Sequence, residues 1–113
     1  METILLNENR NSVAVIQRDI KYMFGCDNYV KFAIENKVLQ KRISLSELEE
    51  LFDKHLFYRV HKQYIINMLW VQKYEKDMVS IDNKEIMISK RNKKKFELAY
   101  IEFRDFLSFT IGG

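Results

Sequence analysis

The sequence predicts a mainly β domain with one short helix and a longer helix toward the C-terminal end. Three observations lead to this fold class. Short runs rich in β-branched and aromatic residues recur along the chain, bounded by Asp, Asn, Gly or Lys. A helical spacing of apolar residues is found twice, after Ser44 and after Lys93. The 113 residues are 47% hydrophobic, which suits a single globular domain over residues 1–113.

Strands are predicted in the part of the chain that precedes Ser44. They are expected over residues 13–16, 20–26, 29–35 and 38–43. The third run alternates, with Val30, Phe32 and Ile34 on one face. Asp27 and Asn28 mark a turn before it, because both residue types bond their own backbone and tolerate left-handed geometry.

Ser44 marks the start of the short helix. Its hydroxyl can cap the first turn, and Glu47 stands three residues later, which completes a capping box. One apolar stripe follows, made of Leu45, Leu48, Leu51 and Phe52. We expect this helix to end near Lys54 and His55.

The second half of the chain returns to strands and ends in the longer helix. Strands are expected over residues 57–60, 64–67, 70–74, 78–81 and 85–89. Hairpin turns are expected at residues 76–77 and 82–84. From Lys93 an amphipathic helix is predicted by a stripe of Phe96, Ala99, Tyr100, Phe103 and Leu107.

Several apolar, polar and thiol side chains are expected to be structural. The predicted core includes Phe57, Tyr58, Tyr64, Ile65, Ile66, Trp70, Phe96 and Phe103. Asn67 ends an apolar run, so we expect it to bond backbone at a turn and to position a neighbouring loop. Cys26 is the one cysteine, and it is predicted to be a buried small apolar residue in a reducing compartment. No membrane-span-length apolar run or signal-peptide n-region is present, so a cytoplasmic location is expected.

Two segments, residues 56–67 and 87–92, combine apolar runs with cationic and polar side chains. The first contains Arg59, His61, Lys62 and Gln63, and the second ends with Ser89, Lys90, Arg91 and Asn92. Neither segment contains an acidic residue. These side chains can donate to phosphates and to base edges, so the two segments suit nucleic acid as the partner. The net charge of +3 alone would not indicate this partner. The residues by themselves are equally compatible with a solvated strand edge whose histidine bonds backbone.

The same two segments resemble the LytTR-type DNA-binding domains of bacterial transcriptional regulators. The signature reads Tyr-Arg-Val-His-Lys-Gln-Tyr-Ile-Ile-Asn over residues 58–67 and Ile-Ser-Lys-Arg over residues 88–91. Gln63 replaces the usual Ser, and Lys90 precedes the second Arg. The resemblance covers residues 13–106. It implies an elongated assembly of small antiparallel sheets that contacts the major groove through loops at one edge, without a recognition helix.

The resemblance also assigns roles within these segments. The position after the His contacts DNA in the family, which is Lys62 here, and the closing Arg that reaches a base edge is Arg91. Lysine suits phosphate or guanine, and the arginine fork matches guanine O6 and N7. Arg59 and His61 would share one strand face, with Val60 and Lys62 on the other.

Further contacts are expected around these residues and at one more turn. Asn92 is a candidate for adenine, and Lys90 for the DNA backbone. Lys93, Lys94 and Lys95 would either contact phosphates or point into solvent. The turn before residue 29 corresponds to another contact loop of the family, with Asn28 and Tyr29 facing bases or phosphates and Lys31 facing a phosphate. Asp27 departs from this pattern, since a carboxylate near DNA is costly.

The expected partner is double-stranded DNA, read as paired direct repeats with one domain on each repeat. A second protomer or a regulatory partner could pair with the C-terminal helix, whose stripe runs on to Ile111. Too few residues precede Val13 for a receiver domain, so we expect either a fragment of a longer regulator or control by expression level or another polypeptide. No cofactor, metal site or enzymatic activity is expected. Two alternatives remain: a protein-binding β module with a basic edge, and a single-stranded RNA-binding domain.

Overall fold

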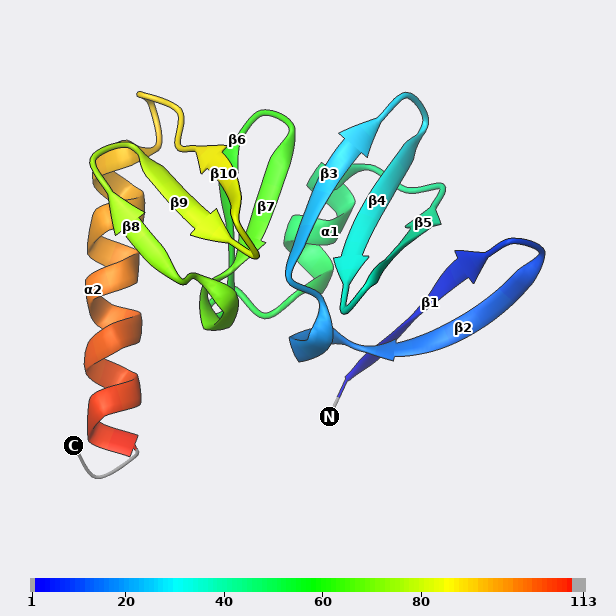
Figure 1. Cartoon of the computed structure of the whole chain (residues 1–113), viewed down its shortest axis with the longest axis horizontal. Helices are drawn as coiled ribbons and strands as arrows, with labels where there is room; N and C mark the ends of the chain where they lie inside the picture. Colours follow the sequence, from blue (N-terminus) through cyan, green and yellow to red (C-terminus); the bar gives the residue numbers. More distant parts are fainter. Residues whose placement is uncertain (1, 111–113) are drawn as a thin grey trace.

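The computed structural model describes residues 2–110, with side chains as far as Leu107. The strands are β1 (Thr3–Glu8), β2 (Asn11–Ile16), β3 (Tyr22–Cys26), β4 (Tyr29–Ile34), β5 (Lys37–Lys41), β6 (Phe57–His61), β7 (Tyr64–Asn67), β8 (Lys73–Glu75), β9 (Met78–Ile81) and β10 (Lys84–Met87). The helices are α1 (Leu45–Leu51) and α2 (Lys93–Thr110), with 3-10 turns η1 (Gln17–Asp19) and η2 (Met68–Trp70). The predicted class, mainly β with a short helix and a C-terminal helix, is confirmed (Figure 1).

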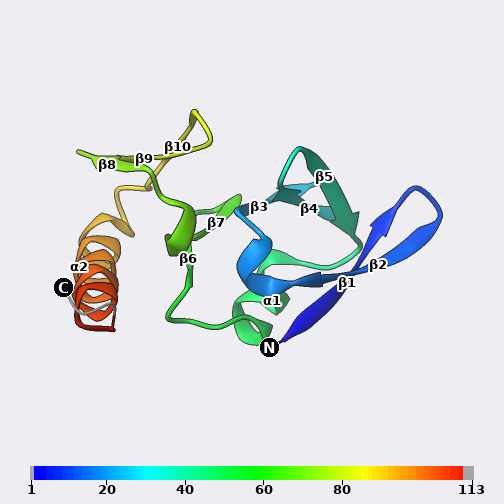
Figure 2. The ribbon, with the colours of Figure 1, turned by 60° about the horizontal axis from the view of Figure 1, so that its bottom comes forward.

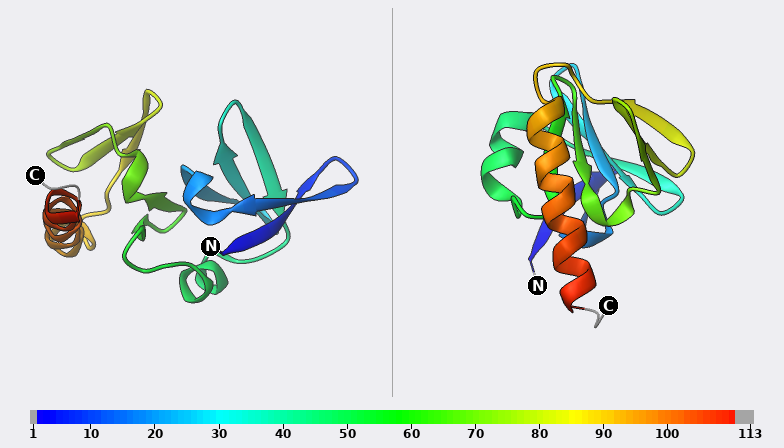
Figure 3. Two further views of the ribbon diagram at one scale, coloured as in Figure 1. Left: turned by 90° about the horizontal axis from the view of Figure 1, so that it is seen from below. Right: turned by 90° about the vertical axis from the view of Figure 1, so that its left-hand side faces the viewer.

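The described strands form two antiparallel sheets. The larger has the order β2-β1-β5-β4-β3-β7-β6, and the smaller has the order β10-β9-β8. Figure 2 shows α1 beneath the larger sheet, and Figure 3 shows α2 and the β1–β2 hairpin at opposite ends of the molecule. The tight turns use left-handed residues, mostly Asn and Asp as the sequence suggested: Asn9 (φ 57°), Asp27 (55°), Asn36 (60°), Lys76 (57°), Asp82 (50°) and Asn83 (66°).

Some elements differ from the sequence prediction. Strand β1 was not predicted, yet it pairs with β2 along its whole length and with β5 at Asn7 and Gln40. Trp70 lies in η2 instead of a strand, because the Asn67 side chain accepts from the backbone N–H of Leu69 and turns the chain there. Trp70 is also 36% exposed, so its assignment to the core was wrong.

Helix α1 has the predicted start and an earlier end. Ser44 caps it through the full capping box with Glu47. The helix ends at Leu51, before the predicted Lys54, and Phe52 leaves it in an extended conformation. Leu51 is 59% exposed, whereas the other members of the stripe, Leu45, Leu48 and Phe52, are buried. Three of the four members of the expected stripe therefore face the core, and Leu51 does not.

Two apolar cores lie on either side of the β6–β7 hairpin. The first packs α1 against the larger sheet and includes Phe57 and Ile65 of the hairpin. The second lies between the hairpin, the smaller sheet and α2, and it includes Val60 and Ile66. Neighbouring residues of β7 thus point into different cores, because side chains alternate along a strand. Both faces of this short hairpin are covered.

Helix α2 contributes its predicted stripe to the second core. Phe96 and Phe103 are buried, while Ala99, Tyr100 and Leu107 are partly buried against the core. Outside this stripe, the helix exposes Leu98, Ile101 and Phe106. The stripe that was expected to continue through Phe109 to Ile111 lies outside the residues whose side chains the structure describes.

A salt bridge and a cation–π contact connect the two sheets. Lys21, just before β3, is buried and pairs with Asp82 in the β9–β10 turn. Its ammonium also lies 4.8 Å from the ring centroid of Trp70. The Trp70 indole N–H donates to the carbonyl of Arg18 at 2.8 Å. These contacts explain why Trp70 is held in place although it lies at the surface.

Asn67 is the buried polar centre of the same region. Its side chain is fully buried, and its amide donates to the carbonyls of Ile20 at 2.9 Å and Arg18 at 3.2 Å. Its oxygen accepts from the N–H of Leu69 at 2.9 Å. The prediction that Asn67 bonds backbone at a turn is confirmed. It stands at the end of β7 remote from the Lys62–Gln63 turn, so it anchors the strand and does not touch that turn.

We predict that Asn67→Ala lowers the free energy of unfolding by about 2–4 kcal/mol, since it leaves buried backbone groups without partners. Urea unfolding of both proteins measures this difference. Asn67→Asp is the matched variant, because it keeps the acceptor for Leu69 and replaces the donor with a carboxylate that faces two carbonyls. We expect it to be at least as destabilising, and a near-neutral Asn67→Asp would contradict the donor role.

Candidate nucleic-acid interface

Three loops lie along one edge of the molecule, at the top of Figure 1. They are the β3–β4 turn, the β6–β7 turn and the β10–α2 segment. Backbone hydrogen bonds connect them. Gly25 N–H, beside the first turn, donates to the carbonyl of Gln63 in the second at 3.0 Å. Ser89 N–H, in the third, donates to the carbonyl of Val60 in β6 at 2.7 Å. The three loops therefore form one connected edge.

Gly25 lies beside the side chain of Gln63. A Cβ placed on Gly25 would stand 2.5 Å from Oε1 of Gln63, so a larger residue there would require the flexible Gln63 side chain to move. Asp27 then reverses the chain with a positive φ, so its role in the turn accounts for a carboxylate at this edge. Asn28 is exposed in the turn, and Tyr29 is 39% exposed at the start of β4. Lys31 lies further along β4 and is half-buried.

The β6–β7 turn is held by its own side chains. The pairing of β6 with β7 shifts register between Arg59 and His61, which indicates a bulge. Strand β6 ends at His61 and Lys62 is exposed in the turn, so the predicted placement of Lys62 on the strand face opposite His61 was wrong. Nδ1 of His61 accepts from the N–H of Gln63 at 3.1 Å. A neutral His61 ring therefore carries its proton on Nε2, which leaves a donor for a ligand.

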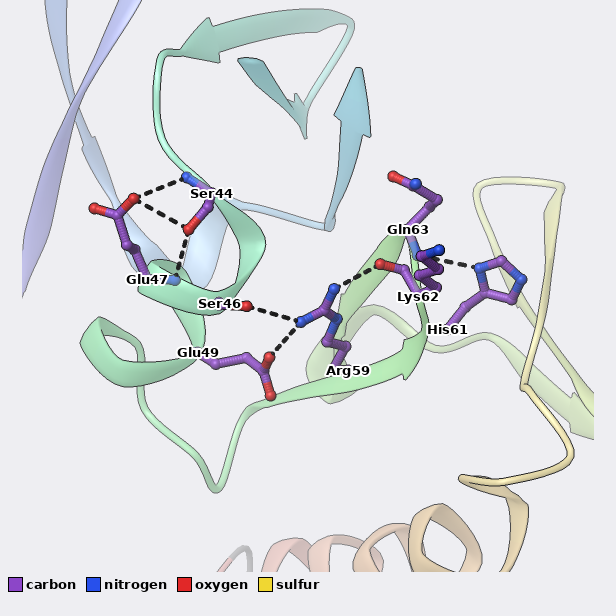
Figure 4. A network of polar contacts seen from close by, with 8 residues as sticks. All are labelled: Ser44, Ser46, Glu47, Glu49, Arg59, His61, Lys62 and Gln63. Carbon is purple, nitrogen blue, oxygen red and sulfur yellow. Dashed lines mark hydrogen bonds and ion pairs between the residues drawn. The ribbon is translucent and has the colours of Figure 1, made fainter. Parts of the chain in front are cut away.

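The guanidinium of Arg59 bonds other groups of the protein (Figure 4). Its Nη1 donates to Oε1 of Glu49 on α1 at 2.7 Å and lies 3.4 Å from the Ser46 hydroxyl. Its Nη2 donates to the carbonyl of Lys62 at 2.6 Å. The side chain is only 26% exposed. Arg59 thus joins α1 to the β6–β7 turn.

The β10–α2 segment presents a second group of polar side chains. Lys90, Arg91 and Lys93 are exposed, while Asn92 is half-buried. The side-chain amide of Asn92 donates to the hydroxyl of Ser89 at 2.8 Å, and the backbone carbonyl of Asn92 accepts from Phe96 N–H in the first turn of α2. Asn92 therefore shapes the start of the helix, and a contact to adenine would require its amide to give up the bond to Ser89.

Lys62 and Arg91 line the same groove, although they are far apart in sequence. The groove is open, has a volume of about 940 Å³ and lies between α1, the β6–β7 turn and the β10–α2 segment. Its wall includes the cations Lys54, Arg59, Lys62, Arg91 and Lys95, together with His61, Ser89 and Asn92. Glu49 and Glu50 also line it, and they pair with Arg59 at 2.7 Å and with Lys54 at 3.9 Å. Cations outnumber carboxylates, and the carboxylates are paired.

The acidic wall and a row of aromatic rings were not anticipated from the sequence. The position of Glu49 opposite Arg59 depends on the packing of α1 against β6, which no local pattern in the sequence specifies. Below the edge, Phe24 stacks on Tyr64 with ring centroids 5.7 Å apart. The ammonium of Lys84 lies 5.8 Å from the centroid of the Tyr64 ring. Tyr64 is half-buried, so it belongs to a partly covered surface. The pairing of β3 with β7 places Phe24 directly opposite Tyr64, and this register between distant strands is seen only in the structure.

The described residues contain no group of three or more His, Cys, Asp or Glu side chains that could hold a metal ion. No helix in residues 2–110 is long and apolar enough to cross a membrane. Cys26 is free and half-buried at the end of β3, so its predicted full burial was wrong. Its place next to the β3–β4 turn explains the partial exposure.

Comparison with known proteins gives one family and one fold. The family model described as the LytTr DNA-binding domain matches residues 10–100. A solved structure of the LytTr DNA-binding domain from a protein described as a methyl-accepting/DNA response regulator of Bacillus cereus has a TM-score of 0.80. It shares 21% sequence identity, and the match covers 88% of this chain and 96% of that one. No curated protein matches the sequence.

Tyr58 on the groove wall gives a pH-dependent prediction. Burial raises the pKa of Tyr58, and also of Tyr22 and Tyr74. The folded protein therefore favours the neutral phenol. The contribution of Tyr58 to the free energy of unfolding is complete below the unfolded pKa of about 10, and it is lost as pH rises through the higher pKa of the folded state. Because phenylalanine does not ionise, we expect the free energy of unfolding of Tyr58→Phe to fall less than that of the wild type above about pH 10. Urea unfolding at a series of alkaline pH values measures this fall, and equal falls in both proteins would contradict the raised pKa of Tyr58.

Proposed function

The chain belongs to the LytTr DNA-binding domain family of bacterial transcription regulators, and we propose that it reads duplex DNA with the three loops of its connected edge. The observation that carries the proposal is that Lys62 and Arg91 line one groove at this edge. The narrowest extent of the protein is 27 Å, whereas the major groove is about 12 Å wide. Loops can enter such a groove, and the body of the protein would remain outside.

The proposed contacts divide into base readout and docking. Arg91 would read guanine through its planar fork, with Lys62 and Asn28 adding sequence preference. His61 would donate from Nε2. Exposed lysines at positions 90 and 93 would contact phosphates, close to the free N–H groups at the start of α2. Tyr29, Lys31 and Asn92 are candidate contacts at the margins of the edge.

The DNA site is proposed to be a pair of direct repeats, each read by one copy of the domain. Direct repeats place two copies in the same orientation, so any contact between them would join different surfaces of the two copies. The exposed Leu98, Ile101 and Phe106 of α2 are candidates for such a contact or for a regulatory partner. Transcriptional control would follow from occupancy of the paired site.

The two alternative functions are a protein-binding β module and a single-stranded RNA-binding domain, and one observation weighs against the RNA alternative. Single-stranded RNA readers need exposed aromatic faces for stacking. Among the described residues, the exposed aromatic side chains are Tyr29, Trp70 and Phe106, and Tyr29 alone lies at the edge. A protein-binding module would show neither preference for duplex DNA nor a steep salt dependence.

We predict that selection from random duplexes recovers a repeated motif, and that Arg91→Ala degrades the preference at one base pair of each repeat. Loss of a bidentate contact removes about 1–3 kcal/mol of discrimination there. Arg10→Ala is the matched control, because Arg10 is exposed in the β1–β2 turn and its loss removes the same charge. Equal retention of all sequences by the wild type would contradict the proposal.

Salt dependence should report the docking contacts. With roughly four to six phosphate contacts, the logarithm of the affinity should fall with the logarithm of salt concentration at a slope of about −4 to −5. Lys93→Ala should make the slope shallower by about 0.9 and leave the preferred motif unchanged. Titrations at several salt concentrations measure both values, with Arg10→Ala as the control. A slope near zero would argue for a non-electrostatic partner.

A further inference from the structure

We infer that Arg59 is a positioning residue for DNA binding, because it fixes the β6–β7 turn that presents Lys62. It does so by bonding both the Glu49 carboxylate and the Lys62 backbone carbonyl, and we call this three-residue contact the latch. The inference rests on the proposed function, in which Lys62 contacts DNA. It gives Arg59 a role that differs from a direct phosphate contact. It also gives a role to Glu49, an acidic residue on the wall of a groove proposed for DNA.

The geometry of the guanidinium is that of a bridge. One nitrogen, Nη1, donates to the Glu49 carboxylate at 2.7 Å, and the other, Nη2, donates to the Lys62 carbonyl at 2.6 Å. A planar fork can hold two partners at a fixed separation, which the point charge of a lysine cannot do. Each terminal nitrogen donates to a group of the protein itself. A phosphate that approached Nη1 would have to compete with the Glu49 carboxylate already paired with it.

The latch completes the fixation of the turn. Gln63 N–H donates to His61 Nδ1 at 3.1 Å, and the Gln63 carbonyl accepts from Gly25 N–H at 3.0 Å. Arg59 donates to the backbone carbonyl of Lys62, which lies between His61 and Gln63 in the turn (Figure 4). The backbone of the turn is thus ordered before DNA arrives. Only the exposed Lys62 side chain remains to be ordered on binding, which lowers the entropic cost of the contact.

The charge of the pair separates this inference from a phosphate contact. Arg59 and Glu49 neutralise each other, so the pair adds little to the release of counterions from DNA. Removing both charges should therefore weaken binding without changing the salt slope. On charge alone, removing Glu49 from a groove that faces DNA should strengthen binding, whereas the latch predicts that it weakens binding.

The first test uses the charge-neutral double variant Arg59→Gln with Glu49→Gln. We expect affinity for the selected duplex to fall about five- to tenfold, with the wild-type salt slope. A slope shallower by about 0.9 would overturn the inference, because it would show that Arg59 touches a phosphate. Unchanged affinity would overturn it as well. Arg59→Lys is the second variant, which keeps the charge, and we expect a similar loss of affinity.

A matched pair of single variants tests the sign. Glu49→Ala should weaken binding, while Glu8→Ala removes the same charge from β1, outside the groove, and should leave binding unchanged. Glu8 is the fitting control because it is also paired with a cation, Lys37 at 3.4 Å, and its side chain is as exposed as that of Glu49. Tighter binding and a steeper slope for Glu49→Ala would overturn the latch, since they would mean that the freed Arg59 contacts DNA.

The last test asks whether Arg59 acts through Lys62. In a double-mutant cycle, Arg59→Lys should cost little further affinity once Lys62→Ala is present, and an equal cost in both backgrounds would overturn the inference. Hydrogen exchange of the Gln63 N–H in the DNA-free protein should be faster in the Arg59 variants, and unchanged exchange would also overturn it. If Lys62→Ala leaves DNA affinity unchanged, the proposed Lys62 contact fails, and the exchange measurement still decides the latch by itself.

Discussion

The β6–β7 hairpin is buried on both faces, and the arrangement of the molecule depends on this constraint. Ile65 lies in the core beneath the larger sheet, and Ile66 lies in the core shared with α2. Apolar alternation cannot fix the register of such a strand, because both faces are apolar. The fully buried Asn67 supplies the missing specification, since its carboxamide matches two carbonyls and one N–H at defined positions. A shift of one residue would leave these groups unpaired inside the protein.

The same hairpin connects stability with the proposed interface. Its Asn67 end is held in the interior, and its other end forms the Lys62–Gln63 turn at the exposed edge. The link continues into α1, because the capping box of Ser44 and Glu47 starts the helix that carries Glu49 to Arg59. A clustering of cations at one edge is unfavourable by itself. The carboxylates of α1 reduce this repulsion on the groove wall and leave the exposed Lys62 and Arg91 unpaired by them.

Local signals in the sequence predicted most elements and two of the loops. Strands β7 and β9, the start of α2 and the Ser44 cap follow from apolar spacing and capping chemistry, which act over a few residues. The turn at Asp27 follows from side chains that tolerate left-handed geometry. Strand β1 was missed, and its sequence does not alternate, because Ile4, Leu5 and Leu6 are all apolar although Leu5 is exposed in the structure. The exposure of Leu51, the turn at Trp70 and the pairing of Glu49 with Arg59 depend on contacts between distant segments, and periodicity carries no information about these.

The division between a fixed backbone and adaptable side chains explains how a small fold can present a binding edge. The three loops are joined by hydrogen bonds from Gly25 to Gln63 and from Ser89 to Val60, so their backbones are constrained together. Lys62 and Arg91 project from this constrained backbone as long, exposed side chains. In the proposed interface, these loops would set the separation of the two cations, and rotation about side-chain bonds would allow each to adjust to a base or phosphate. Freely mobile loops would have to be ordered on each encounter, and that cost would reduce affinity for every sequence without improving discrimination among them.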